Sequence, residues 1–276
     1  MKNIGSLCVI LFFSLNPLLY AQNFTGKKQV IAICAPQEAL DTKEALQYSV
    51  EWLGIPVAKI ILKTEGIEYI KGYPCYHVTA VAIPNRFLKR FYDIEYKVHT
   101  YIDTRFFFPR RFEKSRRINN EFNEVIIDFD QEKNRAAFLS KGSNITFKIS
   151  PLRTTIEASN PVTAVIPYGA QDLLSSFYYF RHIDIKENQS YPINIYYNQR
   201  NWPMNMKVGE PFRREIRKKG TFYVVKVSPD AELNDYILGK RGFSVYLTTD
   251  SRRIPLEFKL ETALGPISAR IQDLPQ

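Results

Sequence analysis

The chain has 276 residues, of which 45% are apolar and 14% aromatic, a composition that excludes a disordered protein and favours a thick β-sheet core. Its formal net charge of +10 suits anionic lipid head groups, lipopolysaccharide or acidic glycans as partners, although solvated strand faces and turns explain the same charge more simply. Because no nucleic-acid-binding motif accompanies the basic residues, we expect no nucleic acid partner.

The first 21 residues have the pattern of a secretory signal peptide. Lys2 gives a cationic start, an apolar run extends from Ile4 to Tyr20, and Ala21 is a small residue at the expected cleavage point. The run is short and Pro17 interrupts it, which disfavours a permanent membrane span. We therefore predict that residues 1–21 are a signal peptide and that the protein is exported, with the periplasm of a Gram-negative envelope as its compartment. Peripheral membrane contact is compatible with this location.

Residues 22–44 are assigned to an N-terminal arm, and strands follow it. Two runs, 46–53 and 57–64, alternate apolar and polar residues and are typical of half-buried strands. Gly54 permits a bend and Pro56 lacks a backbone donor. We therefore predict a hairpin in which residues 54–56 form the bend between the two runs.

The clearest strand is predicted over residues 92–101. Tyr96 and Val98 share one face of it, and Glu95 and Lys97 share the other. Since unpaired buried charges are costly, the charged face must be solvated, which is typical of an antiparallel sheet. The same patterns predict strands over residues 76–83, 112–117, 121–129, 136–139, 145–149, 193–197, 203–208, 211–218, 221–227, 243–248, 254–261 and 266–271, and a loop over 150–168.

One helix is predicted over residues 172–181. Asp172 is a suitable N-cap, and apolar residues recur at helical spacing from Leu173 to Phe180. Arg181 lies near the C-terminal end, where a positive charge favours the helix dipole. We expect the apolar side of this helix to pack on the sheet.

Two turns share the order strand, Asp-led turn, proline and strand. Asp103 and Pro109 belong to the first copy, and Asp250 and Pro255 to the second. Aspartate bonds downstream amides and proline tolerates a strand entry, so Asp103, Asp250 and Pro255 are assigned structural roles in turns.

The predicted fold class is all-β and mainly antiparallel. We expect a curled sheet or a closed barrel-like architecture, with one packed helix near residues 172–181. Residues 45–273 are expected to form a single β-rich domain. The repeated turn suggests two similar halves, 45–149 and 170–273, and chance similarity between hairpins is the alternative.

Two cysteines would remain after removal of a signal peptide. Cys34 and Cys75 would be able to form a disulfide in an oxidising compartment, and two separate buried thiols are the alternative. A cysteine-based metal site cannot be built from two such distant residues, and no metal or other cofactor is predicted.

Several short patterns occur in order along the chain. They are Tyr48 followed by Gly54-Ile55-Pro56-Val57-Ala58; Tyr101-Ile102-Asp103 before Pro109 and Phe112; Phe129-Asp130; Asp172, Leu174, Ser175, Tyr178, Tyr179 and Arg181; and Asp250, Arg253 and Pro255. In their order and spacing the chain resembles the bacterial exported proteins of domain-of-unknown-function family 3108, over about residues 44–272. Ala58 stands where that family usually has glycine. The resemblance implies an exported, mostly antiparallel β protein, and it implies no known activity.

The sequence supports three hypotheses about function. The Asp-led hairpins look like those of periplasmic lipoprotein carriers, whose curled sheet holds acyl chains, which is a likeness of fold alone. The first hypothesis is therefore non-catalytic binding or transport of a hydrophobic or amphipathic envelope ligand, such as a lipid or glycolipid. The second is a structural or assembly factor of the cell envelope that acts through protein–protein contact. The third is a glycan-acting hydrolase.

Catalysis is the weakest of these hypotheses. Asp103, Asp130, Asp172 and Asp250 are the carboxylates that a glycosidase would use, but each has a simpler role in a turn or as a helix cap. No histidine lies in a recognisable catalytic motif. We therefore predict that the protein is not an enzyme, and we assign no catalytic residues.

Five residues are candidates for ligand binding. The aromatic ones would line an apolar cavity beside a cation, although roles as core residues explain the aromatic side chains more simply. The candidates are Trp52, Tyr178, Tyr179, Arg181 and Trp202.

Overall fold

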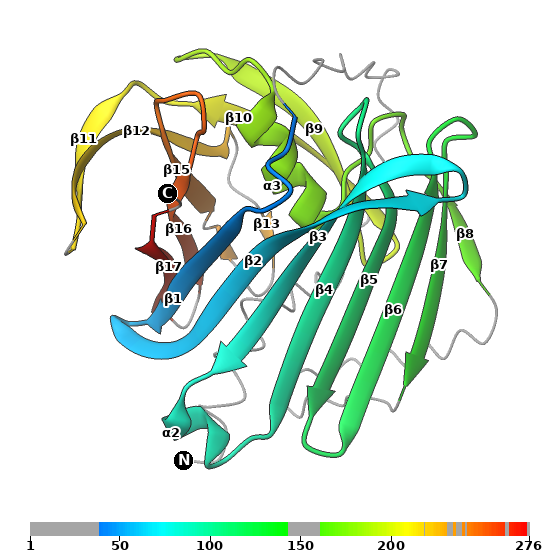
Figure 1. The fold of residues 1–276 in the computed structure, drawn as a ribbon, viewed down its shortest axis with the longest axis horizontal. Helices are drawn as coiled ribbons and strands as arrows, with labels where there is room; N and C mark the ends of the chain where they lie inside the picture. The colour runs from blue at the N-terminus through cyan, green and yellow to red at the C-terminus, as the bar shows by residue number, and fades with distance from the viewer. Residues whose placement is uncertain are drawn as a thin grey trace.

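The computed structural model describes residues 39–142, 161–217, 219–230, 234–235, 239–240, 242–262 and 265–274. The predicted signal peptide, residues 22–38 of the arm and the strand predicted over 145–149 lie outside these ranges. One antiparallel sheet of 15 strands contains most of the described chain, in the order β8-β7-β6-β5-β4-β3-β2-β1-β17-β16-β15-β12-β10-β9, with β11 paired to β12. The prediction of an all-β, antiparallel curled sheet is confirmed (Figure 1).

Most of the predicted strands are present, and many extend beyond the predicted range. The strands are β1 (Ala45–Trp52), β2 (Ile55–Ile70), β3 (Tyr73–Pro84), β4 (Ile94–Asp103), β5 (Pro109–Ile118), β6 (Glu121–Asp130), β7 (Arg135–Gly142), β8 (Val162–Val165), β9 (Ser190–Tyr197), β10 (Arg200–Val208), β11 (Phe212–Ile216), β12 (Gly220–Pro229), β13 (Asn234–Asp235), β14 (Gly239–Lys240), β15 (Phe243–Thr248), β16 (Pro255–Thr262) and β17 (Gly265–Asp273). The helices are α2 (Arg86–Lys89) and α3 (Leu173–His182). Strands β13 and β14 form a separate two-stranded sheet.

The alternation along β4 decides which face of the sheet is inside. Tyr96 and Val98 are buried, whereas Glu95 and Lys97 are exposed. Cross-strand neighbours share a face, so the pairings of β4 with β3 and β5 carry this distinction across the sheet. The inward face therefore packs into the apolar core, which consists of two clusters, one mainly of β1 to β7 and one around α3 and β9.

The sheet curls until its two ends approach each other, and the segment after β8 joins them. Gln171 forms a parallel bridge with Ile195 of β9. Its amide donates to the Asn194 carbonyl at 2.8 Å, and its carbonyl accepts from the Tyr196 amide at 2.7 Å. The Asn201 side-chain amide donates to the carbonyl of Val165, in β8, at 2.7 Å. These contacts give a barrel-like shape without a continuous ladder between β8 and β9.

Helix α3 lies between the two arms of the curl (Figure 1). Asp172 caps it as predicted, because its carboxylate accepts from the Leu174 and Ser175 amides at 2.7 and 2.8 Å. The Thr100 hydroxyl donates to the same carboxylate at 2.5 Å. Burial raises the pKa of Asp172 to about 6, although these hydrogen bonds oppose the shift. None of the described helices has the length and apolarity that crossing a bilayer requires.

One predicted loop contains a strand. Residues 162–165 form β8 at the edge of the sheet, although residues 150–168 were expected to be a loop. Three of the four residues in β8 are exposed, so the segment has no alternation of buried and exposed positions. An edge strand of this kind gives no periodic signal in the sequence.

The first hairpin bends one residue earlier than predicted. Trp52 pairs with Ile55, and the two residues between them, Leu53 and Gly54, have φ values of 52° and 80°. Two positive φ values in a two-residue loop are typical of a type I′ hairpin turn, which explains the glycine. Pro56 lies inside β2, where the register shifts opposite Glu51.

The two Asp-led hairpins share their backbone pattern but not the place of the aspartate. In the first, the Asp103 amide donates to the Phe108 carbonyl, and in the second, the Thr248 amide donates to the Ile254 carbonyl. Both pairs of strands have a register shift beside the turn. Asp250 therefore lies two residues beyond the position that corresponds to Asp103. The division into two similar halves stays a prediction.

Candidate functional site

Two basic residues of β5 point into the core of the protein. Lys114 pairs with Val98 and Arg116 with Tyr96, and both partners belong to the buried face of β4. Lys114 and Arg116 are two positions apart on one strand, so their side chains leave on the same side of the sheet. The inward face therefore carries two adjacent positive charges.

Two tyrosines complete this group, which we call the interior basic cluster (Tyr96, Lys114, Arg116 and Tyr197). Tyr197 reaches it from β9, across the curl of the sheet, and the Lys114 ammonium lies 5.9 Å from the centre of the Tyr197 ring. Burial raises the pKa of Tyr96 well above its usual range, and it raises the pKa of Tyr197 to about 12. Both phenols therefore stay protonated near neutral pH and are able to donate hydrogen bonds.

The charge of Lys114 is poorly compensated. Burial lowers the pKa of its ammonium from 10.5 to about 7, and the neighbouring Arg116 charge adds to the effect. Burial likewise lowers the pKa of Arg116, against the opposing influence of Tyr96, Tyr197 and Glu121. Within the described residues, the Lys114 ammonium forms no ion pair. The cluster is therefore an electrostatic environment that favours an anion.

The surroundings of the cluster are apolar on one side and polar on the other. Val125 of β6 pairs with Lys114 and is buried. Asn123, opposite Arg116, donates from its amide to the Ser140 hydroxyl at 3.1 Å. This arrangement would offer a bound molecule cations, neutral hydrogen-bonding groups and an apolar wall.

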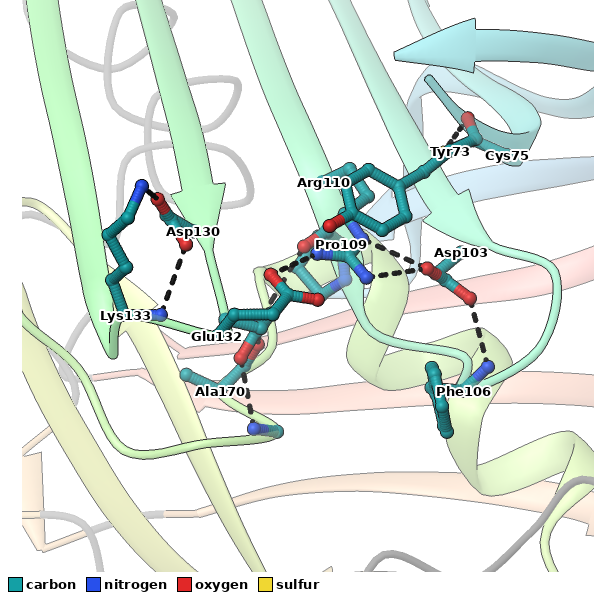
Figure 2. A network of polar contacts seen from close by, with 12 residues as sticks. Tyr73, Cys75, Asp103, Phe106, Pro109, Arg110, Asp130, Glu132, Lys133 and Ala170 are labelled. Carbon is teal, nitrogen blue, oxygen red and sulfur yellow. Dashed lines mark hydrogen bonds and ion pairs between the residues drawn. The ribbon is translucent and has the colours of Figure 1, made fainter. Parts of the chain in front are cut away.

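A second polar network closes the opposite end of the strands (Figure 2). The Arg110 guanidinium donates to Asp103 at 2.9 Å and to Glu132 at 2.7 Å, and it stacks on the Tyr73 ring at 3.6 Å. Burial alone would lower the pKa of Arg110, but the hydrogen bonds to Glu132 and Asp103 outweigh it and raise the pKa. Arg110 is only 3% exposed because Asp103 and the Tyr73 ring cover it.

Gln131 holds the segment after β8 against this end. Its side-chain amide donates to the Ala170 carbonyl at 2.9 Å, and its side-chain oxygen accepts from the Gly169 amide at 2.9 Å. Gln171 in turn donates to the Phe107 carbonyl at 3.1 Å. Because these groups hold one another, we interpret this end as a structural closure.

Asp103→Asn should lower the free energy of unfolding by about 1.5–3 kcal/mol, the usual range for a hydrogen bond to a charged group. Asp103 is 4% exposed and binds Arg110, and its other oxygen accepts from the Arg105 and Phe106 amides. Urea unfolding measures the change. Asp130→Asn is the matched control, because this turn aspartate pairs only with Lys133 at the surface, and it should change stability little. Equal losses in the two variants would contradict a special role for the buried network.

Comparison with known proteins identifies the family but not an activity. The model of the family described as "Protein of unknown function (DUF3108)" matches residues 47–272. The chain belongs to this family. No curated protein sequence matches it.

One solved structure supports the fold of this DUF3108 chain. It is the crystal structure of a beta-barrel-like protein of domain of unknown function DUF1849 from Brucella abortus. The similarity covers 87% of this chain and 100% of the other, with a TM-score of 0.51 and 6% identity. At this identity the similarity concerns the fold alone.

The five predicted ligand-binding residues do not form one group in the DUF3108 fold. Arg181 lies in a buried ion pair with Glu44, at 2.7 and 2.6 Å, and its guanidinium lies 5.4 Å from the Tyr178 ring centre. Tyr179 is buried in α3 as well. Trp52 packs against the apolar cluster that contains most of β1 to β7, whereas Trp202 packs against the cluster around α3 and β9. Their roles in ligand binding stay predictions.

The proposed disulfide also stays a prediction. Cys75 is buried, and its thiol donates to the Tyr73 carbonyl at 3.4 Å. Burial raises the pKa of this thiol to about 12, which disfavours the thiolate, the nucleophilic form. Cys34 lies outside the described residues.

A signal for the interior basic cluster was present in the sequence. Phe112 and Ile118 are buried, and Lys114 and Arg116 occupy the alternate positions between them. Residues at every second position of a strand share one face, and two of these positions are buried and apolar. The two cations at the other two positions are therefore expected on the inward face as well. The chemical similarity of the neighbouring Arg110, Arg111 and Arg117 obscured this pattern.

Proposed function

We propose that the protein is an exported, non-catalytic envelope protein that binds an amphipathic ligand, such as a lipid or glycolipid, through an anionic group. The observation that carries this proposal is the pair of inward-pointing cations, Lys114 and Arg116, on a mainly apolar face. The anionic group would contact these two side chains, and the apolar part of the ligand would lie along the buried face. The periplasm is the compartment that suits such a ligand.

The energetics of burial support this assignment. A cation inside a protein, such as the Lys114 ammonium, destabilises the fold unless opposite charge compensates it. A bound anion would provide that compensation, and charge-assisted hydrogen bonds are among the strongest polar contacts available. The tyrosines of the cluster would add neutral donors.

The carboxylates considered for hydrolysis support a non-catalytic role. Asp103 binds Arg110, Asp130 binds Lys133, and Asp172 caps α3. Asp250 accepts from the Thr248 hydroxyl at 2.6 Å within its own turn. Each of these contacts organises local structure, so we propose no hydrolytic activity.

A pair of related fluorescent probes tests the proposal. N-phenyl-1-naphthylamine is uncharged, and 1-anilinonaphthalene-8-sulfonate has the same rings with a sulfonate. We expect the wild-type protein to bind the sulfonate about tenfold more tightly than the uncharged probe, since one charge-assisted contact contributes about 1.4 kcal/mol. Lys114→Met should abolish this preference while retaining the affinity for the uncharged probe.

Lys97→Met is the matched control for this experiment. Lys97 lies on the neighbouring strand β4 but on the exposed face, so its removal changes the net charge equally and leaves the interior intact. It should bind both probes as the wild type does. An equal loss of preference in both variants would refute the interior site and leave only a general effect of net charge. Recovery of a protein partner in place of any lipid, by cross-linking in cells, would support the assembly-factor hypothesis.

A further inference from the structure

We propose that the end of the sheet around α2 is a docking surface for an anionic lipid bilayer. We call this surface the α2 tip (Ile55, Phe87 and Phe91, with Arg86, Lys89 and Arg90). It lies at the opposite end of the strands from the Asp103–Arg110 network (Figure 1). The proposal goes beyond ligand binding and does not depend on it.

The α2 tip presents aromatic rings to solvent in a defined geometry. Phe87 and Phe91 are 65% and 62% exposed, and their ring centres lie 5.4 Å apart in an edge-to-face pair. Ile55, at the start of β2, is 63% exposed. Exposed phenylalanines of this size are costly in water but favourable at the boundary between head groups and acyl chains.

The local structure holds these side chains in place. Leu88 is only 2% exposed, so it anchors α2 in the core. The Asn85 side-chain oxygen accepts from the Leu88 amide at 2.9 Å, and its side-chain amide donates to the Pro56 carbonyl at 2.6 Å. Asn85 thus joins α2 to the start of β2, which places Ile55 near the two phenylalanines.

The charges around the rings select an anionic surface. Arg86, Lys89 and Arg90 are all exposed, and residues 84–92 contain no carboxylate. The first carboxylates beyond them, Asp93 and Glu95, pair with Arg117 at 3.6 and 2.5 Å. Apolar side chains surrounded by cations are the pattern of proteins that bind the surface of an anionic bilayer.

The position of the tip is also consistent with a membrane as its partner. Ile94 and Ile118 are the last inward-facing pair at this end of β4 and β5, and Tyr96 and Arg116 are the next pair inward. A bilayer that contacts the α2 tip would therefore face the end of the sheet that is nearer to the interior basic cluster.

Vesicle flotation tests the proposal with defined lipids. The purified protein should float with vesicles of phosphatidylcholine containing 30% phosphatidylglycerol, and its partition coefficient for pure phosphatidylcholine vesicles should be at least tenfold lower. Phe87→Ala with Phe91→Ala should lower partitioning into the anionic vesicles at least tenfold. Ile67→Ala with Tyr69→Ala is the matched control, because these side chains are 53% and 73% exposed on the β2–β3 hairpin at the other end of the strands. All variants share the same apolar N-terminal residues, so any contribution of these residues to partitioning is equal. A difference between variants therefore reports the contribution of the α2 tip.

Flotation and probe binding test the α2 tip and the interior basic cluster independently. Lys114→Met should float like the wild type whether or not it loses its probe preference. Equal flotation of the wild type with both kinds of vesicle, or equal losses in the tip variant and the hairpin control, would overturn the proposal. Phe87→Trp gives a second measurement that does not require removal of both rings. Its fluorescence should be quenched by brominated lipid in the anionic vesicles, and an unquenched signal with protein bound would also overturn it.

Discussion

Replacing Arg181 with methionine is expected to lower the free energy of unfolding by about 3–5 kcal/mol, the usual cost of removing one partner of a buried ion pair. The side chains of Arg181 and Glu44 are only 3% and 9% exposed, and two hydrogen bonds join them. The variant would leave the Glu44 carboxylate buried and unpaired. It would also remove a cation that lies over the rings of Phe177 and Tyr178. Chemical denaturation followed by tryptophan fluorescence measures the loss.

A double-mutant cycle shows whether the pair causes this effect. Glu44→Gln combined with Arg181→Met should be more stable than Arg181→Met alone, because no buried charge remains. Arg117→Met removes a surface arginine that pairs with Glu95, where the side chains are 46% and 68% exposed, and should cost less than about 1 kcal/mol. If Arg181→Met costs no more than Arg117→Met, the buried pair does not stabilise the fold.

Lys114→Met is expected to have the opposite effect on stability, raising the free energy of unfolding at neutral pH by about 2–3 kcal/mol. Folding lowers the pKa of Lys114 from 10.5 to about 7, and each unit corresponds to about 1.4 kcal/mol. The expected gain is smaller than the full value because the Lys114 side chain keeps some contact with solvent. The same variant should lose its preference for the sulfonate probe. At this residue, a substitution that stabilises the fold is therefore expected to weaken ligand binding.

The gain from Lys114→Met should depend on pH. Between about pH 7 and 10.5 the unfolded wild-type chain binds a proton at Lys114 that the folded chain does not. The wild type therefore gains stability as the pH rises through this range, and the advantage of the variant shrinks. Below pH 7 the advantage should be constant. Urea unfolding at pH 6.5 and 9.5 measures the change, with Lys97→Met as the control, and a difference that grows with pH would contradict the assignment.

Strand alternation and helix capping were enough to predict much of the fold. In β4, every charged residue between Ile94 and Val98 is exposed and every apolar one is buried, so local sequence and tertiary structure agree. Asp172 and the apolar spacing after it defined α3 for the same reason. Strand β8 was missed because it lies at an edge and three of its four residues are exposed, so that no alternation is visible.

The sites were harder to predict because their chemistry depends on contacts between distant segments. The burial of Arg110 requires Tyr73 from the preceding hairpin and Glu132 from the next one. Similarly, Arg181 was predicted to bind a ligand, but Glu44 lies 137 positions before it and no spacing rule connects the two. The alternation of inward and outward positions along β5 indicated that Lys114 and Arg116 point inward. Tyr197, in contrast, joins them only through the curl of the sheet.

The closure through Gln171 has a consequence for the range of molecules that the interior would accept. A barrel with a full ladder between its first and last strands has a fixed circumference, because widening it breaks many hydrogen bonds together. Within the described residues, the two ends of this sheet are joined by the hydrogen bonds of the bridge at Gln171, by the Asn201–Val165 contact and by side-chain packing, such as that of Phe129 against Tyr196. Each such hydrogen bond contributes only about 0.5–1.5 kcal/mol. We therefore expect the wall to adjust its circumference at a lower cost than a fully paired barrel, which would suit the amphipathic ligand proposed above.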